Sequence, residues 1–203
     1  MSRTKAKDEG TPRGQARREQ ILKAASDLLL AEGYAAFSAR GVAARAGTSL
    51  SHVQYYFATP ADIVAELLDR FVTAYSAEVA THYHASGGAP VARLTRALEF
   101  LLNDEAYRRD CGVFMLEVAG FASRDRGIAA ALARYYEVYL KAITAIVGDL
   151  NPALSAAQRR ARARQAVSLI EGMAMTRPFL RDDDGAFSAR EAARAIERLA
   201  SAG

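Results

Sequence analysis

Residues 36–57 read AFSARGVAARAGTSLSHVQYYF, and this stretch decides the fold. Two short segments with inward-facing apolar residues are separated by Gly47, which ends the first segment because glycine enters left-handed backbone conformations without strain. Ser38 and Ser49 stand before the two segments. Serine is a favoured N-cap because its hydroxyl oxygen accepts a hydrogen bond from an N–H of the first helical turn. Two short helices joined by a tight glycine turn predict a helix-turn-helix.

The second short helix carries side chains suited to reading DNA bases. Val53 and Phe57 are expected to face inward, which leaves a polar face directed outward. A short helix of this kind can lie in the major groove and present hydrogen-bonding groups to base edges. Gln54 is the best candidate for base readout, because its amide can pair bidentately with adenine. Four polar side chains are expected on the outward face: Ser49, Ser51, His52 and Gln54.

Three further residues of this helix can contact DNA in other ways. Leu50 is apolar and is predicted to be exposed, where it either touches a thymine methyl group or packs at the rim of the helix. The hydroxyl groups of Tyr55 and Tyr56 can reach phosphates.

The positive charge of the chain is concentrated near its N-terminus. Residues 1–60 hold nine Lys/Arg and five Asp/Glu, whereas residues 61–203 hold eighteen of each, so the whole net charge of +4 lies in the first part. No acidic residue occurs from Gly33 to Ala61, a window that contains Arg40 and Arg45. Basic groups gain affinity for a polyanion by releasing its counterions, and an acid-free basic window therefore favours DNA as the partner.

Outside this stretch the sequence predicts an all-α protein of about nine helices. The remaining helices are expected from Pro12 to Gly33, from Pro60 to about His84, at 91–103, 110–123 and 126–150, from Ser155 to Pro178, and after Ser188. Thr59, Pro60 and Asp62 supply a cap, a proline for the first turn and an acid near the positive helix end. We expect a flexible basic arm at 1–12, a DNA-binding domain at 13–60 and a ligand-binding and dimerisation domain at 61–203.

Composition excludes several other classes of protein. The single cysteine, Cys111, can form no internal disulfide. Neither a signal peptide nor an apolar run of membrane-spanning length is present. We therefore expect a cytoplasmic protein without membrane contact. No nucleophile elbow, Walker motif or dinucleotide motif occurs, and we expect no enzyme and no cofactor. His82 and His84 lie two residues apart on a predicted helix and point to different faces, so no metal site is expected.

The stretches Arg17–Leu22, Ala31–Tyr34, Val42–Ser49 and Tyr55–Phe57 resemble the DNA-binding domain of the TetR/AcrR family of transcriptional regulators. The resemblance covers roughly residues 13–70. It implies a homodimer on a palindromic double-stranded DNA operator, and usually a repressor released by a small-molecule effector. The family's DNA contacts carry over to Ser38, Ala39, Arg40, Ser49, Leu50, Ser51, His52, Gln54, Tyr55 and Tyr56, and Arg17 and Thr59 complete the predicted set.

The chain departs from the family pattern at the start of the fourth helix. The family usually has a phosphate-contacting lysine where this sequence has Pro60, and Thr59 together with the helix N–H groups could take over that contact. Gln54 stands where many members carry a tyrosine, which indicates a different base preference. The body from Phe114 to Phe179 is loosely similar to the choline-responsive BetI subgroup.

The helical body contains many large side chains that either fill its core or line an apolar ligand cavity. Glu117 interrupts the apolar run VFMLEVAGFA, and its carboxylate faces either such a cavity or the surface. The predicted cavity residues are Phe71, Tyr75, Phe100, Phe114, Glu117, Phe121, Tyr139 and Met173.

Homodimerisation is expected through the last two helices, around 163–177 and 188–199, which carry small residues and apolar stripes. The alternative is that these stripes pack inside one subunit. The basic cluster from Arg159 to Arg164 is interpreted as a solvated helix face rather than a second nucleic-acid site.

Other functions stay open beside the repressor. A ligand-dependent activator of the same family would have the same sequence features. A helical enzyme would show turnover, and a non-specific nucleoid protein would bind palindromic and scrambled DNA equally.

Overall fold

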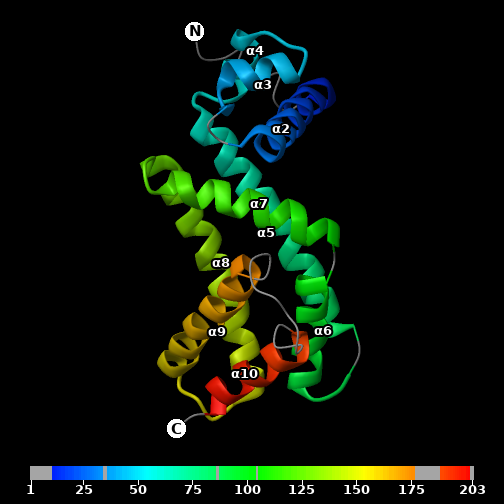
Figure 1. Ribbon diagram of the computed structural model, residues 1–203, viewed down its shortest axis with the longest axis vertical. Helices are drawn as coiled ribbons and strands as arrows, with labels where there is room; N and C mark the ends of the chain where they lie inside the picture. Colours follow the sequence, from blue (N-terminus) through cyan, green and yellow to red (C-terminus); the bar gives the residue numbers. More distant parts are fainter. Residues whose placement is uncertain (1–10, 34–35, 86, 104, 177–187, 202–203) are drawn as a thin grey trace. The chain divides into compact units, whose positions relative to one another are not determined.

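The computed structural model describes residues 11–33, 36–85, 87–103, 105–176 and 188–201, and for residues 75, 103 and 105–113 it describes the backbone alone. Over these ranges the chain is all-α, as predicted, with nine helices (Figure 1). They are α2 (Pro12–Glu32), α3 (Ala39–Arg45), α4 (Leu50–Tyr56), α5 (Pro60–His84), α6 (Pro90–Asn103), α7 (Glu105–Ala122), α8 (Arg126–Leu150), α9 (Ala156–Thr176) and α10 (Ala189–Ser201). Most of the predicted arm, residues 1–10, lies outside the described residues.

The predicted helix boundaries among the described residues agree with the structure to within one or two residues, except at α7, and the predicted end at Pro178 lies outside the described residues. Helix α7 begins at Glu105 and not near Asp110. The prediction was wrong because residues 105–109 read EAYRR, in which glutamate, alanine and arginine favour the helix and nothing breaks it.

The chain forms two compact units. Unit 1 consists of Met1–Arg70 and Val113–Ala133, and unit 2 of Phe71–Gly112 and Arg134–Gly203. This division by packing differs from the predicted functional boundary at residue 60, which stays a prediction. Among the described residues no helix combines the length and the apolar character needed to cross a bilayer.

Unit 1 is built around the contact of α2 with α3. A side chain at Gly41 would meet the Leu28 side chain at 3.1 Å, so α3 lies close against α2 at this point. The Gln20 side-chain amide also donates to the backbone oxygen of Ala46 at 2.8 Å, which holds the end of α3 on α2. The fully buried large residues of this unit come from α2 to α5 and from α8: Ile21, Leu22, Leu29, Val42, Val53, Ile63, Val64, Leu68 and Ile128.

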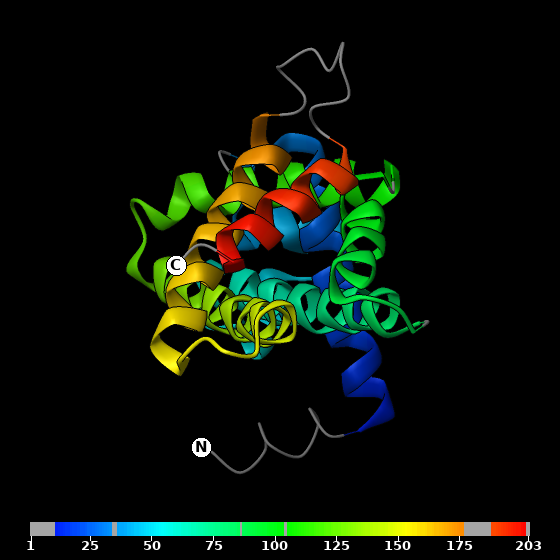
Figure 2. The same cartoon turned by 90° about the horizontal axis from the view of Figure 1, so that it is seen from below.

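Unit 2 has a core to which α6, α8, α9 and α10 all contribute. Helix α10 packs along α6 and α9, as Figure 2 shows in the view from below. The buried residues of this core include Leu94, Leu98, Ile143, Val147, Ala163, Ala166, Ile170, Ala192, Ala193 and Ile196.

The same packing changes the argument for the dimer. The stripes around Ala163 and Ile196 were the reason to expect a dimer seam, and they are buried inside one subunit. The structure therefore supports the alternative for these residues, and a dimer on α9 and α10 would use their other faces. Exposed groups on those faces include Arg164, Ser168, Met175, Arg190 and Arg194.

Candidate nucleic-acid interface

Helices α3 and α4 form the predicted helix-turn-helix. Helix α3 ends at Arg45, and Gly47 adopts the left-handed conformation, with φ 59°, that a glycine provides without strain. The turn is closed by the backbone N–H of Thr48, which donates to Ala43 O at 3.0 Å. The two short helices are in contact with each other, and α3 is in contact with α2.

Ser49 caps α4 as the sequence predicts. Its hydroxyl oxygen accepts a hydrogen bond from the backbone N–H of His52 at 3.2 Å and lies 2.9 Å from the Ser51 hydroxyl oxygen. The Oγ1 of Thr48 lies 3.2 Å from Nδ1 of His52. These polar groups fix the first turn of α4, so Ser49 and His52 have a structural role in addition to any contact with a base.

The inward and outward faces of α4 are those that the sequence predicts. Val53 is buried within α4, and Phe57, which caps the helix, is buried as well. The polar side chains Ser49, Ser51, His52 and Gln54 are exposed. Gln54 makes no hydrogen bond with any described residue, which leaves its amide available to a base.

Leu50, Tyr55 and Tyr56 are half-buried. The two tyrosine rings meet edge to face, with centroids 5.0 Å apart, so each restricts the orientation of the other. Leu50 was predicted to be exposed, and its intermediate burial fits packing at the rim of the helix as well as contact with a thymine methyl group.

The start of α3 adds a second group of predicted contacts. The hydroxyl oxygen of Ser38 accepts a hydrogen bond from the backbone N–H of Gly41 at 3.1 Å, and Ala39 begins the helix. Arg40 is exposed and makes no ion pair with a described residue, so its charge is available to a phosphate. Arg45, in contrast, pairs with Glu32 at 3.2 Å.

The residues before α5 cap that helix reciprocally. The backbone N–H and the hydroxyl of Thr59 donate to one carboxylate oxygen of Asp62 at 2.8 and 2.9 Å, and the Asp62 N–H donates to the Thr59 hydroxyl oxygen at 3.2 Å. This is a capping box with an aspartate in the acidic position. The carboxylate takes up the donors that Thr59 would offer to a phosphate and repels the anion, which weakens the argument for Thr59 as a replacement for the missing lysine.

An ion-pair network joins α2 to α5. Arg18 binds Glu66 through two guanidinium nitrogens, and its guanidinium carbon lies 4.6 Å from the centroid of the Phe57 ring. Arg70 binds Glu19 and Glu66, and its hydrogen bonds hold the pKa of Glu19 below the ordinary value. Sequence reasoning missed this network, because the paired residues are separated by 48 and 51 positions.

Arg17 was also predicted to contact DNA. It lies in α2, is half-buried, and donates to the Gln20 side chain at 2.8 Å. Since Gln20 in turn binds Ala46 O, Arg17 belongs to the contacts that hold α2 against the end of α3.

The predicted ligand-cavity residues are divided between the two units. In unit 1, Phe114 is buried and Phe121 half-buried. The carboxylate of Glu117 lies at Gly33, where an added β-carbon would meet both of its oxygens at 3.3 Å. Glu117 is thus half-buried against the end of α2, a position that the sequence did not indicate.

In unit 2, the predicted cavity residues pack with other aromatic side chains. The rings of Phe71 and Tyr139 lie 6.4 and 6.2 Å from that of Tyr135, and Phe100 stacks on His82 at 4.4 Å. Met173 packs against the core, and the side chain of Tyr75 lies outside the described part of the chain. The cavity stays a prediction.

Two arginines of the cluster on α9 have partners within the chain, whereas Arg164 is exposed, and the interpretation of the cluster as a solvated helix face stays a prediction. Arg159 donates to the backbone oxygens of Leu154 and Pro152 at 2.9 and 2.7 Å, and Arg160 pairs with Glu137 at 3.1 Å.

Comparisons with known proteins find similarity to bacterial transcriptional regulators. A family described as bacterial regulatory proteins, tetR family, matches residues 21–67. An uncharacterised HTH-type transcriptional regulator from the dhlA 5′ region of Xanthobacter autotrophicus is 32% identical over 123 residues. That match covers 60% of this chain and 60% of the relative.

Solved structures resemble the chain over most of its length. A putative TetR-family transcriptional regulator from Rhodococcus sp. has a TM-score of 0.72 at 20% identity, over 91% of this chain and 98% of that chain. A putative transcriptional regulator from Saccharomonospora viridis in complex with choline has a TM-score of 0.70 at 20% identity, over 92% and 96%. At these identities the likeness concerns the fold. None of the comparisons confirms the predicted similarity to the BetI subgroup.

Proposed function

We propose that this chain, whose residues 21–67 match the tetR family of bacterial regulatory proteins, is a sequence-specific DNA-binding transcriptional regulator of that family. The proposal includes a homodimer on a palindromic operator and repression that a small molecule relieves. The observation that carries it is the outward face of α4, where an exposed Gln54 without a partner among the described residues stands beside Ser51 and His52. No enzymatic activity is part of the proposal.

The charge of unit 1 supports DNA as the partner. Arg40 is exposed at the start of α3, and no acidic residue lies between Gly33 and Ala61. Helices α3 and α4 themselves therefore present no carboxylate to a duplex, and Glu32, which reaches α3, is paired with Arg45. Phosphate contacts of this kind fix the position of a protein on DNA, while side chains such as Gln54 supply the sequence preference.

Release by a ligand requires that the body alter the spacing of the two α4 helices in a dimer. Successive major grooves on one side of a duplex are roughly 34–36 Å apart, and a ligand that favours another spacing lowers the affinity for the operator. Within unit 1, α7 and α8 contact the segments that flank the helix-turn-helix: Glu117 of α7 lies against Gly33 at the end of α2, and at Gly127 of α8 a β-carbon would meet the Ala61 β-carbon of α5 at 3.3 Å. Helix α5 continues from this unit into the next and is our candidate for the lever.

Selection of bound genomic fragments by the purified protein tests the DNA proposal. The selected sequence and a scrambled version are then compared by fluorescence anisotropy at physiological salt. We expect the selected sequence to bind more tightly by about 10³-fold or more. Equal affinity for both would show a non-specific nucleoid protein and overturn the proposal.

Variants of α4 connect that preference to the proposed residues. Gln54→Ala is expected to cost about 1–3 kcal/mol of discrimination, or about 5- to 150-fold in affinity, because a bidentate base contact is lost. Tyr55→Phe removes the hydroxyl but keeps the ring that packs on Tyr56. Gln165→Ala, on the exposed side of α9, is the matched control and should leave DNA binding unchanged. Sequence-selective binding that survives Gln54→Ala combined with Tyr55→Phe would overturn the assignment of α4.

The direction of regulation and the dimer are tested separately. A reporter gene placed behind the selected operator distinguishes a repressor from an activator, and sedimentation at micromolar concentration gives the association state. Choline is one compound with which to test release, since the Saccharomonospora viridis regulator of the same fold is in complex with it.

A further inference from the structure

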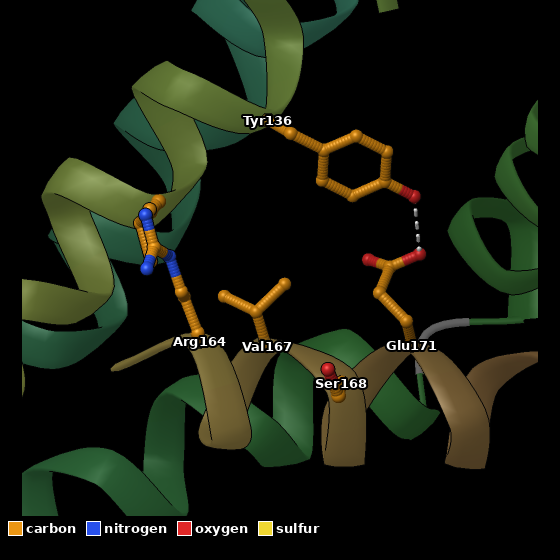
Figure 3. Close-up of a pocket in the computed structure, with 6 residues that line it drawn as sticks. Tyr136, Arg164, Val167, Ser168 and Glu171 are labelled. Atoms are coloured by element: carbon orange, nitrogen blue, oxygen red, sulfur yellow. Dashed lines mark hydrogen bonds between the residues drawn. The ribbon is translucent and has the colours of Figure 1, made fainter. Parts of the chain in front are cut away.

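A groove between α8 and α9 is the feature of unit 2 that the packing of the core leaves unexplained. Its volume is about 450 Å³, within the range of small-molecule sites. Figure 3 shows that Tyr136 comes from α8, and Arg164, Val167, Ser168 and Glu171 from α9. None of the predicted cavity residues lines it.

A carboxylate lies at one end of the groove. The Tyr136 hydroxyl donates to Glu171 Oε2 at 3.2 Å, as the dashed line in Figure 3 marks. Burial raises the pKa of Glu171, and the hydrogen bond from Tyr136 opposes that effect only in part. A carboxylate that has lost hydration in this way gains from a cation that enters the groove.

A guanidinium lies at the other end. Arg164 and Glu171 are seven residues apart on α9, which places them on one side of the helix with about 10.5 Å between their α-carbons. Within one subunit Arg164 is exposed and makes no hydrogen bond or ion pair with any residue that the structure describes. It lies on the face of α9 that a dimer on α9 and α10 would use, so a dimer that covered this face would close the groove. The planar group of Arg164 can accept a carboxylate bidentately.

The wall between the two charged ends includes apolar side chains. Val167 lies between Arg164 and Glu171 on α9 (Figure 3). Leu140 of α8 also lines the groove. A ligand that is only cationic would leave Arg164 to repel it, and a ligand that is only anionic would meet the Glu171 carboxylate. The arrangement is therefore complementary to a molecule with opposite charges at its two ends and methylene groups between them.

We propose that this groove binds a small aliphatic amino acid with a terminal amine, whose ammonium group pairs with Glu171 and whose carboxylate pairs with Arg164. The methylene chain would lie on Val167 and Leu140. The proposal deepens the proposed function and rests on it only for the consequence of binding, because occupancy of the groove is measurable without DNA.

Isothermal titration calorimetry of the full chain with 6-aminohexanoate tests the site. We expect saturable binding with a Kd of about 1 mM or tighter. Hexylamine lacks the carboxylate and hexanoate lacks the amine, so each should bind about tenfold more weakly or worse. Glu171→Gln and Arg164→Ala should each weaken 6-aminohexanoate by about tenfold or more, since each removes one charge-assisted contact.

Two matched variants control for non-specific effects on the helices. Glu137→Gln makes the same chemical change on α8, and Arg160→Ala the same change on α9, and neither residue lines the groove. Both should bind 6-aminohexanoate as the unaltered chain does. Circular dichroism of every variant shows whether the helices are retained.

Three results would overturn the proposal. The first is no saturable binding of 6-aminohexanoate by the unaltered chain. The second is equal binding of hexylamine, together with no effect of Arg164→Ala. The third is a change of association state in sedimentation for Glu171→Gln and Arg164→Ala without loss of ligand binding, which would show that the groove is a contact between two copies of the chain. Failure of DNA binding alone would contradict the proposed function and leave this site standing.

Discussion

Replacing Gly33 by alanine tests whether α2 needs a glycine as its C-cap. Gly33 caps the helix with φ 68° and ψ 176°, and its N–H donates to Leu29 O at 3.0 Å. This is a region of backbone conformation that is essentially confined to glycine. An added β-carbon would also lie 3.3 Å from both carboxylate oxygens of Glu117. Gly33→Ala therefore introduces backbone strain and side-chain crowding together.

The two effects differ in size. Holding a non-glycine residue in such a conformation costs about 1–3 kcal/mol. The crowding costs less, because the carboxylate is the far end of a flexible side chain and has to move by only a few tenths of an ångström. We expect a loss of about 2 kcal/mol in the free energy of unfolding. For a chain of this length that corresponds to a melting temperature lower by about 4–8 °C.

Urea and thermal unfolding followed by circular dichroism measure the loss. A double-mutant cycle with Glu117→Ala separates the two effects, and we expect it to restore less than about 0.5 kcal/mol. Gly172→Ala is the matched control: Gly172 lies within α9, and a β-carbon there meets nothing within 4 Å. It should stabilise the helix by about 0.5–1 kcal/mol. A Gly33→Ala variant as stable as the unaltered chain would refute the strain argument, as would complete recovery by Glu117→Ala.

Three further predictions concern charged groups. Because burial raises the pKa of Glu171, the folded state favours its protonated form, and the stability that this contributes is fully present below pH 4.5 and lost as the pH rises through the folded pKa. Glu171→Gln should therefore flatten the dependence of the melting temperature on pH and raise the melting temperature at pH 7. Thermal unfolding at several pH values will check this. Arg40→Ala should lower DNA affinity about equally for all sequences and reduce the slope of log K against log salt by about 1, measured by anisotropy; an unchanged slope would mean that Arg40 contacts no phosphate. Asp62→Ala removes the carboxylate that accepts from Thr59, and urea unfolding should show a loss of about 1 kcal/mol, whereas an unchanged midpoint would contradict the capping role.

The beginnings and ends of helices could be predicted from the sequence because their signals are local. Ser38, Ser49 and Thr59 each stand directly before the helix that they cap, and each cap is formed by a hydrogen bond over three residues. Gly33 and Gly47 end helices for the equally local reason that they adopt positive φ. The start of α7 was missed where no such signal exists, since residues 105–109 are simply compatible with a helix.

The partner of an apolar or charged face could not be predicted, because it depends on chain segments that are far apart. The stripe around Ala163 and Ile196 has the pattern of a dimer seam and of a core alike, and only the packing of α10 on α6 and α9 shows that it is core. Tyr136 and Glu171 meet across 35 residues, so nothing in the sequence around either indicates the groove. Glu117 reaches Gly33 for the same reason.

The ion pairs between α2 and α5 join residues that are far apart in the sequence, and they connect two elements of the proposed function. Arg18 touches both Phe57, at the end of α4, and Glu66 of α5, so a single side chain connects the candidate recognition helix to the candidate lever. Arg70 adds bonds to Glu19 and Glu66, and bidentate pairs of this type constrain direction more than single surface ion pairs do. A displacement of α5 relative to α2 must therefore break these bonds or carry α2 and Phe57 with it. Because the pairs are partly exposed, breaking them costs little, whereas a movement of α5 that preserved them would be transmitted through Arg18 to Phe57, the residue that ends α4.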